Sequence, residues 1–175
     1  MKITILIAED DEGLRSSLEK SLKRRGHETL CASTVSEANR LLQKRKIDLM
    51  LLDLRLADGS GFDVLAKARD LDEEIAVIMM TAFPDVKIAV RAMKEGASDF
   101  IVKPFELEDL HLTLQRVIEA RELRRQVRRL EHEQQRQGDF AEILGESPVI
   151  EQVRSQIRKV AVADSPVLVA GETGT

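Results

Sequence analysis

The stretch IDLMLLD, residues 47–53, is an unbroken run of apolar side chains that ends on an acid. Apolar residues in succession, rather than in alternation with polar ones, are typical of a strand buried on both faces, as in a parallel sheet. Further short apolar runs have the same character: ITILIA (3–8), TLCA (29–32), IAVIMM (75–80) and FIV (100–102). The chain therefore carries five candidate strands of one parallel sheet.

Amphipathic stretches typical of helices separate these runs. The first, residues 12–25, ends at Gly26, and the second, 35–45, opens with Thr34 and Glu37 at capping-box spacing. Two more span 61–71 and 85–95, and a fifth begins at Glu106. This rhythm predicts a doubly wound α/β domain over residues 1–118 with one parallel sheet. If its strand order is 2-1-3-4-5, the flavodoxin-like order, the ends of the first and third strands are neighbours.

The fifth helix continues past the end of this domain, because residues 106–137 contain no glycine or proline. Residues 119–138 form a predicted linker helix. Its apolar positions follow the 3-4-3 spacing of a coiled-coil seam: Ala120, Leu123, Val127 and Leu130. We interpret this seam as a short coiled coil that joins two copies in a homodimer.

Five arginines flank the same seam: Arg121, Arg124, Arg125, Arg128 and Arg129. They fit the solvated flanks of a dimeric coiled coil, which is the interpretation we favour. The alternative is a basic patch for nucleic acid. Nothing in the chain is similar to a helix-turn-helix, so direct DNA binding is the weaker hypothesis.

Polar side chains follow the predicted strands at the points where each strand ends. Glu9 and Asp10 follow the first strand, Asp53 the third, Thr81 the fourth and Lys103 the fifth. The carboxyl ends of parallel strands meet at one edge of a sheet, where ligands of open α/β sheets bind. Acids after strands are also common as helix caps, and Asp10 or Asp11 alone would fit that role. The ordered set of strand ends favours a shared site.

Carboxylates that gather at one edge repel one another unless a cation offsets their charge. An all-oxygen site with few protein ligands suits Mg²⁺, which keeps several waters. Asp53 supplies a carboxylate nucleophile able to form an acyl phosphate, and Lys103 adds a second positive charge for the phosphoryl oxygens.

Residues 1–118 resemble the receiver domain of bacterial two-component response regulators. The matching stretches are LIAEDD, LLDLRLADGSGFDVL, MMTAF and DFIVKPF. The chain departs from the family pattern at Ala57, where a proline is frequent, and keeps the expected glycine at Gly61.

The resemblance implies a role for each site residue. Asp53 would be the phosphoacceptor, with a sensor histidine kinase as the phosphodonor. Mg²⁺ would contact Asp10, Asp53 and the main-chain carbonyl of Arg55 directly, and Glu9 through water.

The same resemblance implies a switch. Thr81 would bond a phosphoryl oxygen and move toward it, and Phe100, at the aromatic switch position, would then rotate inward. Lys103 would pair with the phosphoryl group, and the Lys103–Pro104 peptide bond is expected to be cis.

Residues 139–175 read as a loop, a helix from 149 to about 162 and a strand at 167–170. This tail resembles the start of the AAA+ ATPase module of nitrogen-regulatory-protein-C-type activators of sigma-54 RNA polymerase. The chain ends within a partial Walker A loop, before its lysine: Gly171, Glu172, Thr173, Gly174 and Thr175. We therefore expect no ATP binding and no ATPase activity from this chain.

The leading hypothesis is a phosphorylation-dependent response regulator that controls an ATPase output and sigma-54-dependent transcription at DNA. A nucleotide-binding ATPase is disfavoured by the absent lysine, and a stand-alone receiver acting through protein contacts stays open. The single cysteine, Cys31, excludes a disulfide framework and favours the cytoplasm. No apolar run approaches the roughly 20 residues that span a membrane, so no membrane partner is expected.

Overall fold

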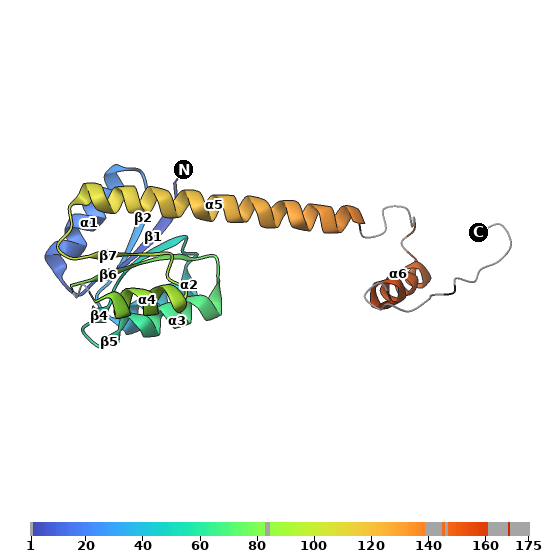
Figure 1. Cartoon of the computed structure of the whole chain (residues 1–175), viewed down its shortest axis with the longest axis horizontal. Coiled ribbons are helices and arrows are strands. Elements are labelled where there is room, and N and C mark those ends of the chain that lie inside the picture. The colour runs from blue at the N-terminus through green and yellow to red at the C-terminus, as the bar shows by residue number, and fades with distance from the viewer. Residues whose placement is uncertain (1, 83–84, 139–144, 146, 161–167, 169–175) are drawn as a thin grey trace. The chain divides into compact units, whose positions relative to one another are not determined.

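The computed structural model describes residues 2–82, 85–138, 145, 147–160 and 168 (Figure 1). The chain divides into two compact units, Met1–Arg124 and Arg125–Thr175. The elements in chain order are β1 (Thr4–Ala8), α1 (Glu12–Arg24), β2 (Glu28–Ala32), α2 (Val35–Lys44), β3 (Leu49–Asp53), β4 (Arg55–Leu56), β5 (Gly59–Ser60), α3 (Gly61–Leu71), β6 (Ala76–Thr81), α4 (Val86–Lys94), β7 (Asp99–Val102), α5 (Leu107–Gly138) and α6 (Pro148–Val160).

A parallel sheet of five strands in the order β2-β1-β3-β6-β7 forms the first unit. The predicted fold class and strand order are thus confirmed. The central strand β3 is buried along its whole length, as its unbroken apolar run indicates.

Two hydrophobic cores lie on opposite faces of this sheet, and Figure 1 shows the helices that cover them. Leu18 and Leu22 of α1 pack with Leu110 and Leu114 of α5 on one face. The helices α2, α3 and α4 cover the other face, against alternate residues of the same strands. Because β1, β3 and β6 each contribute side chains to both cores, their sequences show no polar alternation.

The helix ends match the capping signals in the sequence. Asp11 caps α1 by accepting a hydrogen bond from the Leu14 N–H at 2.6 Å, and the Oγ1 of Thr34 accepts from the Glu37 N–H at 3.1 Å. Gly26 follows α1 with φ of 85°, in the left-handed region that favours glycine.

Two local features differ from the prediction or lie outside the described residues. The short antiparallel hairpin β4–β5 was not predicted. The strand predicted at 167–170 lies outside the described residues, apart from Leu168, which belongs to no helix or strand. The seam positions Ala120, Leu123, Val127 and Leu130 lie on α5 and are exposed.

The interpretation of Arg121 as a solvated flanking residue is wrong. Its side chain is 9% exposed, and its guanidinium donates to Asp48 at 2.9 Å and to the Glu74 carbonyl at 2.9 Å. Asp48 in turn accepts from the Thr4 N–H at 2.9 Å. The helical pattern placed Arg121 next to the seam, but the tertiary contact with Asp48 turns it toward the domain.

Among the described residues, no helix combines the length and apolarity needed to cross a membrane.

We expect Arg121→Met to lower the free energy of unfolding by about 3 kcal/mol, because removal of one partner leaves the Asp48 carboxylate half-buried without its counter-charge. Arg116→Met is the control: its side chain, paired with Asp99, is 71% exposed, and its loss should cost under about 1 kcal/mol. Urea unfolding followed by circular dichroism measures both, and equal losses would contradict the assignment.

Candidate functional site

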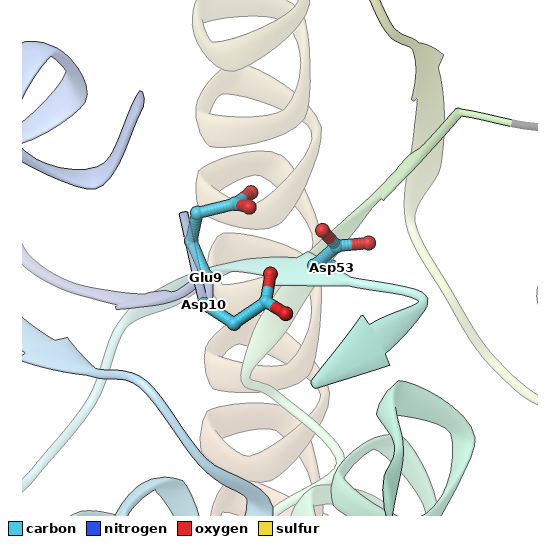
Figure 2. A group of neighbouring side chains, drawn as sticks. All are labelled: Glu9, Asp10 and Asp53. Atoms are coloured by element: carbon cyan, nitrogen blue, oxygen red, sulfur yellow. The ribbon is translucent and has the colours of Figure 1, made fainter. Parts of the chain in front are cut away.

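The pairing of the central strands brings three acids together. Ala8 of β1 lies opposite Leu52 of β3, so Glu9 and Asp53 leave the sheet side by side. One carboxylate oxygen from each of Glu9, Asp10 and Asp53 lies within 4.8 Å of the others. Figure 2 shows the three carboxylates gathered at the ends of β1 and β3. The predicted cluster is present, and its oxygen donors could hold a metal ion.

Lys103 reaches this cluster from the end of β7. Its ammonium nitrogen lies 2.6 Å from Glu9 and 2.5 Å from Asp53. Thr81, 5% exposed at the end of β6, accepts the Lys103 N–H at its main-chain oxygen at 2.7 Å. The Lys103–Pro104 bond is cis, as expected. The structure thus places all the predicted strand-end residues at one edge of the sheet.

Burial governs the electrostatics of the site. Burial raises the pKa of Glu9 to about 7, with the neighbouring Asp53 charge acting in the same direction against the hydrogen bond from Lys103. Burial alone would lower the pKa of Lys103, but its hydrogen bonds to Asp53 and Glu9 outweigh this and raise it. Three carboxylates share a single ammonium group, so the site carries an excess of negative charge. This excess favours the binding of a cation.

Arg15 of α1 holds the loop that carries Glu9 and Asp10. The Arg15 guanidinium donates to the main-chain oxygen of Glu9 at 2.7 Å and to that of Asp10 at 3.1 Å. Asp11 caps α1 and does not belong to the cluster of Glu9, Asp10 and Asp53.

A close approach of two backbones fixes the loop after Asp53. A Cβ atom on Gly61 would lie 2.1 Å from the main-chain oxygen of Asp53. The Gly61 N–H donates to the Leu54 carbonyl at 2.9 Å, and the Arg55 N–H donates to the Asp53 carboxylate at 3.1 Å. Only glycine fits at position 61 without displacing the phosphoacceptor candidate.

Sequence reasoning missed Asp58, which lies in the turn between β4 and β5. Its carboxylate accepts hydrogen bonds from the start of α2. The Asp58–Gly59 pair is a common turn signal and would have indicated a turn in this stretch. Its partners lie 22 residues away or more, and no local pattern reveals them.

Phe100 on β7 is 38% exposed. It lines an apolar groove of about 660 Å³ together with Thr81 at the end of β6 and Val90 and Met93 of α4. The space between the two predicted switch residues is therefore open at the surface. The partial Walker A positions 171–175 lie outside the described residues.

Comparison with known proteins identifies the family. Residues 5–115 match the family described as the response regulator receiver domain. The chain belongs to this family.

Curated relatives of this receiver domain extend over most of the chain. The regulatory protein AtoC of Escherichia coli is 32% identical over 98% of the chain and 37% of its own length. The alginate biosynthesis transcriptional regulatory protein AlgB of Pseudomonas aeruginosa is 36% identical over 98% of the chain and 38% of its own length. The chain thus spans less than two fifths of these relatives.

A solved structure extends beyond the receiver domain as well. NtrX of Brucella abortus, crystallised with ADP, is similar with a TM-score of 0.70 at 32% identity, over 92% of this chain and 36% of that one.

We expect Gly61→Ala to cost about 3 kcal/mol of stability, because the new Cβ would collide with the backbone of Asp53 and force it to shift. Gly13→Ala in α1 is the control: its Cβ would meet Asp11 Oδ1 at 3.3 Å, and alanine should be neutral or stabilising there. Thermal unfolding of both variants measures the difference, and a tolerated Gly61→Ala would contradict the close approach.

Proposed function

We propose that Asp53 accepts a phosphoryl group from a phosphohistidine of a sensor histidine kinase. The observation that supports this most is the convergence of Glu9, Asp10 and Asp53 around the ammonium of Lys103. One oxygen of Asp53 attacks phosphorus, the P–N bond breaks, and its electron pair stays on the imidazole nitrogen.

Asp10, Asp53 and the main-chain carbonyl of Arg55 would hold Mg²⁺ directly, and Glu9 through water. When bound, Mg²⁺ neutralises charge on the transferred phosphoryl oxygens. Oxygen donors from few residues, one of them exposed, fit a metal that keeps several waters.

Lys103 offsets the carboxylates before transfer and would pair with a phosphoryl oxygen afterwards. Its present partner, the Asp53 Oδ2 atom at 2.5 Å, belongs to the group that receives the phosphoryl. The ammonium therefore need not travel far to stabilise the product.

Thr81 and Phe100 would transmit the change. The Thr81 hydroxyl would bond a phosphoryl oxygen and leave space at the apolar groove, and Phe100 would turn inward to fill it. Burial of the exposed Phe100 ring is favourable. Phosphorylation would therefore shift an existing equilibrium between the outward and inward positions of Phe100.

For the whole protein we propose an output in transcription. Residues 1–118 would be the receiver, 119–138 the linker helix and 139–175 the start of a sigma-54-activator ATPase domain. Phosphorylation would alter the packing of a cytoplasmic homodimer and the assembly of the ATPase modules that act with sigma-54 RNA polymerase at DNA. The names of the relatives as regulatory proteins support a regulatory output.

A stand-alone receiver acting through protein contacts remains the alternative. It shares the Asp53 chemistry and differs only in the output.

Incubation with a small acyl phosphate and Mg²⁺ tests the central proposal. We expect a mass gain of one phosphoryl group on the native chain and none on Asp53→Asn, because the amide is not a nucleophile for phosphorus. Asp63→Asn, an exposed acid on α3, is the control and should be modified as the native chain is. A phosphorylated Asp53→Asn would overturn the assignment.

Analytical ultracentrifugation tests the dimer. We expect Leu123→Ala combined with Leu130→Ala to raise the dimer dissociation constant at least about tenfold, since two apolar side chains leave the seam. Glu122→Ala, on the same helix outside the seam, is the matched control. Unchanged association in the double variant would show that α5 does not form the interface.

A further inference from the structure

The β4–β5 hairpin is attached at its tip to the start of α2. The Asp58 carboxylate accepts hydrogen bonds from the Val35 N–H at 2.5 Å, the Ser36 N–H at 3.1 Å and the Ser36 Oγ at 2.8 Å. Val35 and Ser36 are the first residues of α2. Their N–H groups have no partner within the helix, and the helix dipole favours a carboxylate at this end.

Asp58 is not needed as the N-cap of α2. Thr34 already occupies that position and accepts from the Glu37 N–H at 3.1 Å. The hydrogen bonds of Asp58 therefore join the β4–β5 hairpin to α2, two elements that are distant along the chain. These bonds position the hairpin and are not needed to cap the helix. The two elements also lie close together: a Cβ added at Gly59 would lie 3.2 Å from the Val35 Cγ2 atom.

The base of the hairpin is anchored independently. Leu54 and Leu56 are 9% and 6% exposed and belong to the core under α2 and α3. Gly61 closes the base through its hydrogen bond to the Leu54 carbonyl. Arg55, paired with Ser60 in the ladder, lies between the anchored base and the anchored tip.

We propose that Asp58 is a positioning residue for the magnesium site, because it fixes the hairpin backbone that presents the Arg55 carbonyl. This inference rests on the proposed function, in which that carbonyl is a Mg²⁺ ligand. A main-chain ligand has no rotamer to adjust, so its position depends on the backbone around it. Mg²⁺ demands near-ideal octahedral geometry, and groups that orient its ligands affect affinity strongly.

Magnesium titration followed by NMR tests the proposal. We expect Asp58→Ala to raise the Mg²⁺ dissociation constant about tenfold, the lower end of the effect of losing a residue that orients a metal ligand. Ser36→Ala, which removes only the hydroxyl bond, should raise it less. At saturating Mg²⁺, Asp58→Ala and Ser36→Ala should both be phosphorylated by an acyl phosphate at the native rate, because Asp53, Lys103 and Thr81 are unchanged. Amide exchange at residues 55–60 should be faster in Asp58→Ala.

Asp72→Ala is the matched control. Like Asp58, Asp72 is an exposed acid whose carboxylate accepts a backbone hydrogen bond, here from the Glu74 N–H at 2.8 Å. Asp72 follows α3, at the edge of the sheet opposite the acid cluster. The Asp72→Ala variant should bind Mg²⁺ with the affinity of the native chain.

Native Mg²⁺ affinity in Asp58→Ala, or equal weakening in Asp72→Ala, would overturn the positioning role. Failure of the native chain itself to bind Mg²⁺ or to accept phosphoryl would instead contradict the proposed function.

Discussion

The contact of one ammonium group with two buried carboxylates organises this molecule. Glu9 is fully buried and Asp53 nearly so, and Lys103 lies within 2.6 Å of both. Two carboxylates at such depth would be costly without a counter-charge, because burial penalises the ionised form. The three groups come from the ends of β1, β3 and β7, so their meeting requires the parallel sheet, its strand order and its register at once.

The same charge balance supports the proposed role of the site in accepting a phosphoryl group. Lys103 offsets part of the negative charge, and the third acid, Asp10, is exposed at the rim of the site. The excess charge favours a divalent cation, and the cation and the lysine together favour a phosphoryl group. A core of apolar strands carries this polar edge, and Arg15 and Gly61 hold the two loops on which the acids lie.

Much of this arrangement was predictable from local sequence. The apolar runs are unbroken because β1, β3 and β6 are interior strands, and the caps at Asp11 and Thr34 depend on neighbours within a few residues. The βα rhythm indicates a parallel sheet, and the flavodoxin-like strand order, which the resemblance to receiver domains implies, places Glu9, Asp10, Asp53 and Lys103 together.

The features that sequence reasoning missed depend on partners far away in the chain. Arg121 lies beside an apolar seam on the helix, but Asp48 and the Glu74 carbonyl turn it inward across 73 and 47 residues. Asp58 reads as an ordinary turn residue, and its role at the start of α2 depends on the packing of the hairpin. Local propensity carries no information on such contacts, because side chains of the same type are usually solvated at a turn or on a helix surface.

Thermal unfolding with and without Mg²⁺, at equal ionic strength, tests most directly whether the acid cluster is a cation site. We expect Mg²⁺ at about 100 times its dissociation constant to stabilise the native chain by about 2.7 kcal/mol, and Asp10→Asn to lose most of this response. A native chain whose stability does not respond to Mg²⁺, or an Asp10→Asn variant that responds equally, would contradict it.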